Sequence, residues 1–270
     1  MIRINHNPAL GHMKACSGQG QISAGATYKG TALKTLYFAA LAMVTAMAVM
    51  IWLFNALEAY FAADGYMGEF PMGILIGILI GGMVLSLVGV IGSIFARRAI
   101  PVFGTIYAVG QGAVLGVLSG FAELAFPGVV MAALLSTFTV FVVMSVLFFT
   151  GIVKVGQKFR SVMMSVLISV FIFSLLFTLM LWIMPGLRNA MTDAGGMFIW
   201  ISIGISVLMI IVASLFILFD LSLIKEAVDG GLDKSFEWWG AFGLTVTLLW
   251  LYMEFLRLFI KIAAIAGRRR

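Results

Sequence analysis

The chain has 270 residues, of which 63% are hydrophobic and only 10% are charged, and its mean hydropathy is +1.14. Water-soluble domains carry about 25% charged residues, so the composition excludes a soluble domain and indicates an integral membrane protein. The net charge of +6 is then expected to face anionic membrane lipid, and nucleic acid is not an expected partner.

The residue types that carry most enzyme chemistry are scarce. Cys16 is the only cysteine, and both histidines, His6 and His12, lie in the polar N-terminal segment. There is no Ser/His/Asp set, no Gly-rich phosphate loop and no cluster with metal-ligand spacing. The sequence therefore predicts neither an enzyme nor a resident cofactor.

Seven apolar runs are each long enough to cross a bilayer, which takes about 20 helical residues. They lie at about 36–56, 72–96, 99–122, 128–150, 161–184, 197–219 and 240–264. The connectors between them are too short for a soluble domain. The sequence predicts an all-α polytopic membrane protein, with one seven-helix transmembrane domain over residues 35–270. A polar, basic segment at 1–34, expected to be disordered and cytoplasmic, precedes it.

Lysine and arginine alternate between connectors, which predicts the orientation because these residues are retained in the cytoplasm. They gather before the first run and in every second connector, as Arg3, Lys14, Lys29, Lys34, Arg97, Arg98, Lys154, Lys158, Arg160, Lys225 and Lys234. The N-terminus is thus expected in the cytoplasm. Seven crossings place the last three arginines, residues 268–270, on the side of the membrane opposite the cytoplasm, although arginine is normally retained in the cytoplasm. Either the last segment is unusual or the early spans dominate, and we expect seven crossings.

Glycines recur every fourth residue in two runs. Gly73, Gly77 and Gly81 follow this spacing in the second run, and Gly112, Gly116 and Gly120 follow it in the third. Small residues at this spacing let helix backbones approach closely. Both sets are therefore interpreted as helix-packing faces.

Glu254 and Arg257 lie inside the last apolar run, where a charge costs at least a few kcal/mol. Their spacing of three puts them on one helix face, within reach of an ion pair. One interpretation is that the pair only neutralises itself. The other is that Glu254 meets a second carboxylate, Asp220, near the cytoplasmic end of the sixth run.

Two carboxylates held close together share a proton and titrate as a pair, so an Asp220–Glu254 pair could couple pH to helix packing. Contact requires the sixth helix to extend past Asp220, or the seventh to begin outside the membrane with Trp238 and Trp239 at the interface. The spacing does not decide this. If a metal site exists, these two carboxylates are its candidates. Glu123, at the outer end of the third run, is either an exposed loop carboxylate or an attractor of cations.

The segment "FILFDLSLIKEAV" followed by "EWWGAFGLTVTLLWLYMEFLRLF", with "NPALG" near the start, resembles the Bax inhibitor family in its bacterial YccA-like branch. The resemblance covers most of the chain. It implies a seven-helix bundle with the last helix central, wrapped by the other six. It also implies a proton-sharing sensor formed by Asp220 and Glu254, contacted by an arginine that best matches Arg98, with Arg97 adjacent.

Two features depart from the family pattern: the second run lacks an acidic residue, and Arg257 places a positive charge beside the sensor. The resemblance implies a pH-modulated cation leak channel of the bacterial inner membrane, with calcium as the ion. The alternative is a non-conducting regulator that binds other membrane proteins, such as a quality-control protease, and the basic N-terminal segment favours it.

Overall fold

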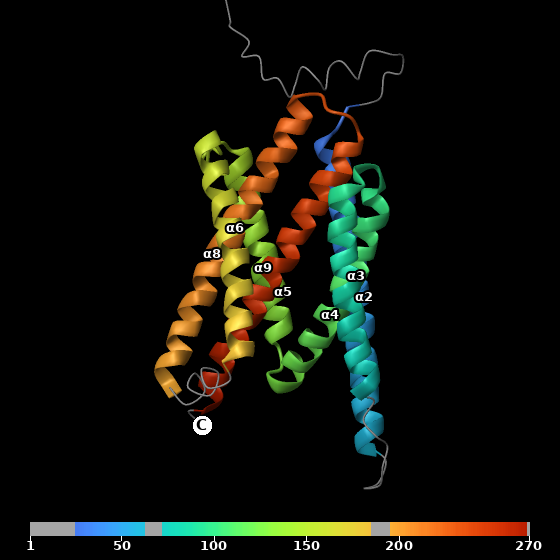
Figure 1. The fold of residues 1–270 in the computed structure, drawn as a ribbon, viewed down its shortest axis with the longest axis vertical. Helices are drawn as coiled ribbons and strands as arrows, with labels where there is room; N and C mark the ends of the chain where they lie inside the picture. Colours follow the sequence, from blue (N-terminus) through green and yellow to red (C-terminus); the bar gives the residue numbers. More distant parts are fainter. Residues whose placement is uncertain (1–24, 63–71, 185–194, 269–270) are drawn as a thin grey trace, which may run out of the picture.

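The computed structural model describes residues 25–62, 72–184 and 195–268, and every element in these ranges longer than three residues is an α-helix (Figure 1). The elements are α2 (Tyr28–Ala62), α3 (Met72–Phe95), the short 3₁₀ helix η1 (Arg97–Ala99), α4 (Ile100–Ala125), α5 (Val129–Phe149), α6 (Gln157–Ile183), α8 (Gly195–Asp229) and α9 (Ser235–Arg268). Six of them, all except η1 and α9, are long and apolar enough to cross a membrane. The predicted all-α polytopic architecture is confirmed.

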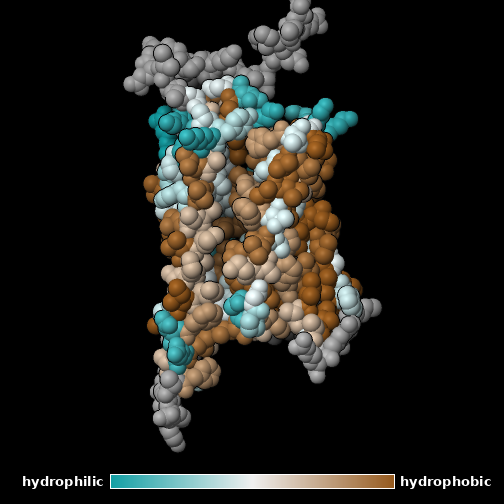
Figure 2. Space-filling view, turned by 180° about the vertical axis from the view of Figure 1, so that it is seen from behind, coloured by the Kyte–Doolittle hydropathy of each residue, from teal (hydrophilic) through white to brown (hydrophobic). Residues whose placement is uncertain are grey.

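The bundle has two chemically different ends. At one of them, here called the basic end, α2, α4, α6 and α9 begin and α3, α5 and α8 end (Figure 1). Contacts tie these segments together: Tyr28 Oη donates to Asp229 Oδ1 at 3.2 Å, and the Tyr28 ring meets the Phe149 ring. Figure 2 shows hydrophilic side chains gathered at this end and hydrophobic ones over the middle of the face.

The last helix, α9, lies inside the bundle and runs from the basic end to the opposite end (Figure 1). Its 34 residues span about 50 Å, and Arg268 therefore ends far from Ser235. It packs against α2, α4, α5 and α8, whereas α3 packs mainly on α4, and α6 packs on α8. The prediction of a central last helix is confirmed, with α3 and α6 in outer positions.

The helices follow the predicted apolar runs, and five of the seven continue past a predicted end into polar sequence, whereas α3 and α5 do not. α2 starts at Tyr28 instead of about residue 36, and α8 continues nine residues past Asp220 to Asp229. Polar residues can be helical here because tertiary partners bond them: Lys34 of α2 and Thr27, just before the helix, both bind the carboxylate of Glu237. The predicted disordered segment 1–34 thus overlaps α2, and residues 1–24 lie outside the described ranges.

The glycines of α4 permit close contact with the backbone of α2. A Cβ at Gly112 would lie 2.5 Å from Ala42 O, and one at Gly116 would lie 2.5 Å from Ala46 O, so both face α2. The packing role of the set 112, 116 and 120 is confirmed. Gly73, Gly77 and Gly81 have no atoms within 4 Å of such a Cβ, and that packing prediction is wrong. A spacing of four cannot tell which helix face is covered; α3 packs on α4 through Gly82 and Gly89.

Gly116→Ala is expected to destabilise the bundle by about 1–3 kcal/mol, because its methyl group would meet the Ala46 carbonyl and Val49. Gly77→Ala is the matched control. It adds the same methyl group on an open face, and the expected result is no loss or a gain of up to about 1 kcal/mol. Unfolding of the detergent-solubilised chain measures both. Equal losses at the two positions would contradict the packing assignment.

Candidate functional site

The antiparallel pair α8 and α9 carries most of the intramembrane charged groups, and a tight turn sets how the two helices align. Gly231 takes a left-handed conformation (φ 62°) after the last turn of α8. The backbone N–H of Leu232 donates to Ala227 O at 3.0 Å, and that of Gly231 donates to Val228 O at 3.1 Å. This is a Schellman ending, which glycine favours. It turns the chain so that α9 starts at Ser235.

Three contacts show the alignment that results. Nearest the turn, the Thr247 hydroxyl donates to Asp220 Oδ2 at 2.5 Å. Further along, the Phe216 and Trp250 rings lie 5.8 Å apart, and Lys261 Nζ donates to Ser206 Oγ at 2.7 Å and to Ser202 O at 2.9 Å. The contacts move down α8 and up α9 by matched numbers of residues. The alignment therefore holds over most of the hairpin.

Asp220 is a partly buried carboxylate with a neutral partner. Besides Thr247, its neighbour on α9 is Gly243, where a Cβ would lie 3.7 Å from Asp220 Oδ1. No lysine or arginine among the described residues lies within ion-pair distance of Asp220. Intramembrane acids usually pair with a base or face a wet cavity. An acid held only by a hydroxyl can therefore change charge without breaking an ion pair.

Glu254, the other predicted sensor residue, has different partners. Its side chain is buried, and Oε1 accepts hydrogen bonds from Arg257 Nη1 and from Trp250 Nε1, both at 3.1 Å. The structure thus forms the local ion pair at spacing three, within α9 itself. The Arg257 side chain is 57% exposed. Glu254 therefore already has a counter-charge without contacting α8.

No hydrogen bond joins Asp220 to Glu254. The condition for their contact is met, since α8 extends past Asp220, but the turn aligns Asp220 with Thr247. Glu254 lies seven residues beyond Thr247, which is about 10 Å along the helix. The same alignment places Glu254 near Ala213, a fully buried small residue of α8. The proton-sharing role of the pair stays a prediction, and the two carboxylates occupy separate positions.

The other predicted site residues lie near the two ends of the bundle. Glu123 accepts hydrogen bonds from the backbone N–H groups of Gly128 (2.7 Å) and Val130 (3.1 Å). It therefore caps the otherwise unpaired N–H groups where α5 begins. Arg98 lies at the basic end in η1, just before α4 begins at Ile100. No hydrogen bond links Arg98 to either carboxylate. Arg97 is the first residue of η1, and its side chain lies outside the described part.

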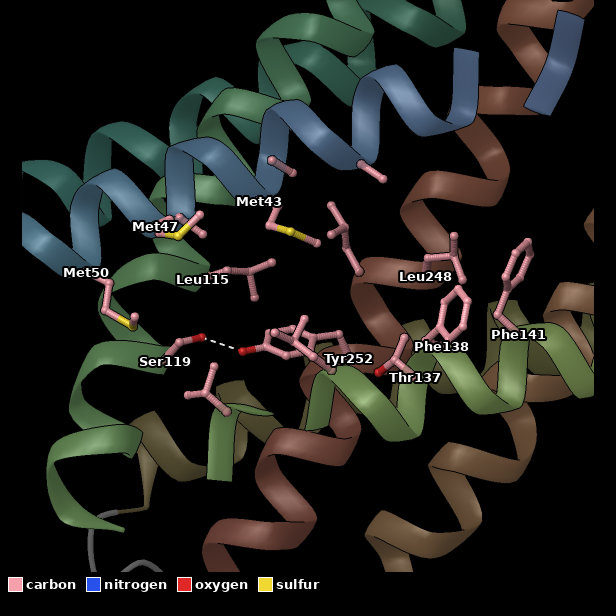
Figure 3. A pocket seen from close by; sticks show the side chains of 16 residues that line it. Met43, Met47, Met50, Leu115, Ser119, Thr137, Phe138, Phe141, Leu248 and Tyr252 are labelled. Carbon is pink, nitrogen blue, oxygen red and sulfur yellow. Dashed lines mark hydrogen bonds between the residues drawn. The ribbon is translucent and has the colours of Figure 1, made fainter. Parts of the chain in front are cut away.

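A groove of about 320 Å³ lies between α2, α4, α5 and α9. Figure 3 shows Met43, Met47 and Met50 of α2 on one side of it, facing Phe138 of α5. Its hydroxyl groups already have partners: Ser119 Oγ lies 2.7 Å from Tyr252 Oη, and Thr137 donates to Ala133 O. An apolar lining offers a cation no ligands. The groove is therefore not a cation site.

Sequence reasoning missed one buried carboxylate, Glu237 in the first turn of α9. Lys34 forms an ion pair with it, and the backbone N–H and the hydroxyl of Thr27 each donate to Oε1 at 2.9 Å. Gly30 makes room for the group, since a Cβ there would overlap it. Burial raises the pKa of Glu237, but the hydrogen bonds from Lys34 and Thr27 outweigh this and hold the pKa below its ordinary value of 4.5. The feature of the sequence that could have predicted this cluster is an acidic residue, Glu237, next to Trp238 in a connector that also contains lysine.

These features define a polytopic helical membrane protein with ionisable groups on its two last helices. A family model described as Bax inhibitor 1 like matches residues 7–264, nearly the whole chain. The chain belongs to this family. No curated protein and no solved structure matches it. Within the described residues, no group of three or more His, Cys, Asp or Glu side chains is placed to hold a metal ion.

Proposed function

We propose that this protein is a pH-modulated cation leak channel, with calcium as the ion, and that Asp220 carries the response to pH. The observation behind the proposal is the contact of Asp220 with Thr247 across the α8–α9 interface. An ionised Asp220 accepts a hydrogen bond from the Thr247 hydroxyl. A protonated Asp220 carries an O–H donor of its own, which competes with the hydroxyl donor of Thr247. Protonation therefore changes a contact between two long helices, which is what a gate requires.

The role of Glu254 in this proposal differs from that of Asp220. Its bonds to Arg257 and Trp250 pair the two opposite charges within α9, so the helix can be buried with its charge compensated. Calcium prefers oxygen ligands, which Asp220 and Thr247 can supply. The proposal does not require Asp220 and Glu254 to touch. It also assigns no role to the apolar groove of Figure 3.

Calcium flux tests the proposal. The purified chain is reconstituted in liposomes, and calcium entry is measured with a trapped indicator at several external pH values. Protein-dependent entry that changes with pH is expected. The absence of entry above that of empty liposomes would remove the channel. The alternative function, a non-conducting regulator that binds membrane proteins such as a protease, would then remain.

We further propose that the chain belongs to the bacterial YccA-like branch of the family and lies in the inner membrane. In this proposal the basic end of the bundle faces the cytoplasm. Support comes from the lysine and arginine residues there, among them Lys154, Lys158 and Arg160, which the positive-inside tendency places in the cytoplasm. A reporter enzyme fused after Arg160 is therefore expected to read as cytoplasmic. A fusion within 185–194 is the matched control and should read as external. The reverse pattern would overturn the orientation.

A further inference from the structure

A second cavity, of about 440 Å³, opens at the basic end of the bundle. Its lining comes from three separate parts of the chain, namely Lys34 of α2, Arg98 and Pro101 at the start of α4, and Lys234, Ser235 and Trp238 at the start of α9. Ligand cavities commonly have this size. None of these residues belongs to the Asp220 contact, so the cavity is separate from the site described above.

Three cationic side chains, Lys34, Arg98 and Lys234, line the cavity, and the buried Glu237 is the only anion that pairs with one of them in the described part of the chain. Lys34 is held by its ion pair with Glu237, and its ammonium lies 4.9 Å above the Trp238 ring. Arg98 and Lys234 are exposed, and neither side chain has a hydrogen bond or ion pair within the described part of the chain. Asp233 is next to Lys234, but its Oδ1 accepts the backbone N–H of Lys234 at 2.8 Å. The cavity therefore favours an anion.

The donor geometry suits a phosphate group. A guanidinium offers paired N–H donors that match two phosphate oxygens, and an ammonium adds a point charge. The Ser235 hydroxyl adds a further donor, next to the start of a 34-residue helix. The charged oxygens of a phosphate can accept hydrogen bonds from all three side chains.

The surroundings indicate a lipid as the source of this phosphate. The Tyr37 ring packs against Trp238, and its hydroxyl lies 3.2 Å from Thr105 Oγ1, one turn below Pro101. Tyrosine and tryptophan favour the level of the lipid headgroups. Next to Lys34 on α2, Leu33 and Leu36 are 57% and 64% exposed. The cavity thus adjoins the apolar surface that acyl chains cover.

We propose that this cavity binds the headgroup phosphate of an anionic phospholipid, held by Arg98, Lys234 and Ser235 beside the fixed Lys34. Basic pockets between transmembrane helices bind anionic headgroups in this way. A lipid bound there bridges η1, α2 and the start of α9. It would therefore link η1 to the two helices, α2 and α9, that the Lys34–Glu237 pair already joins. This proposal does not depend on cation conduction.

Native mass spectrometry of the full chain in detergent tests it, with phosphatidylglycerol as the probe. Arg98→Gln with Lys234→Gln is expected to weaken binding roughly tenfold or more, since each cation near a lipid phosphate contributes about a factor of five. The matched control is Lys154→Gln with Lys158→Gln. It removes two exposed cations at the same end but outside the cavity and is expected to bind as the wild type does.

Three outcomes overturn the proposal. Equal weakening by both double variants means diffuse attraction instead of a site. Equal binding of phosphatidylcholine means that the lipid charge is not recognised. Displacement of phosphatidylglycerol by glycerol 3-phosphate at comparable concentration means that the occupant is a free phosphate ester. Thermal unfolding checks that the variants fold. If the Arg98→Gln, Lys234→Gln double variant does not fold, each single substitution is tested instead and is expected to weaken binding severalfold.

Discussion

Asp220→Asn is expected to leave a folded protein whose calcium leak no longer changes with pH. The amide matches the carboxylate in size, and its oxygen can still accept the Thr247 hydroxyl, so the α8–α9 contact found at 2.5 Å is preserved. An amide does not titrate, so the pH response disappears. Flux into liposomes at a series of pH values measures it. Asp229→Asn, the same change at the exposed end of α8, is the control and should respond to pH as the wild type does.

Glu254→Gln is expected to give the opposite result, with the pH response kept and stability reduced. The substitution removes the counter-charge of Arg257, whose side chain is 57% exposed and can be solvated in part. The loss is therefore about 1–2 kcal/mol, below that of a fully buried pair. Because Glu254 lies about 10 Å along α9 from Thr247, the residue that contacts Asp220, the double mutant should show both effects independently.

A different pattern would restore the proton-sharing pair. If Glu254→Gln alone abolished the pH response and the double mutant added nothing, the two carboxylates would act as one unit. The helices would then have to pass through an arrangement in which α9 slides about two turns relative to α8. The Ser206–Lys261 and Phe216–Trp250 contacts would have to break in that arrangement, which makes it costly.

Hydropathy predicted the seven long helices of the described ranges, because crossing a bilayer requires a long run of apolar residues. It could not predict their ends, since these depend on partners distant in sequence. Tyr28 and Thr27 are helical or nearly so because Asp229 and Glu237 bond them. The start of α2 was therefore predicted eight residues too late, by a rule that treats polar residues as loop.

The alignment of α8 with α9 was the decisive unknown for the site. A five-residue connection and the left-handed Gly231 fix it, and a change of one turn would have moved Asp220 to another partner. The sequence contains both carboxylates but no signal that selects Thr247 as the neighbour. Glycine spacing failed for a similar reason: Gly81 is on the open face of α3, while the adjacent Gly82 contacts Gly110.

Glu237→Gln is expected to cost roughly 3 kcal/mol of stability at neutral pH, the low end for breaking a buried ion pair. The Lys34 side chain is only 16% exposed, so it cannot be fully solvated once its counter-charge is removed. Glu226→Gln is the matched control. It breaks the ion pair with Arg160 at the same end, but Glu226 is 64% exposed, and the expected loss is below about 1 kcal/mol.

The contribution of Glu237 should also depend on pH in a defined direction. Its pKa in the folded protein lies below the ordinary value of 4.5, so its ionised form stabilises the fold fully above that value. This stabilisation is lost as the pH falls through the folded pKa. Unfolding of wild type and Glu237→Gln in detergent, compared at pH 7 and at progressively lower pH, should show a difference in the free energy of unfolding that narrows as the pH falls below 4.5. If the difference were constant with pH, or absent at pH 7, the Lys34–Glu237 pair would not be what holds α2 to α9.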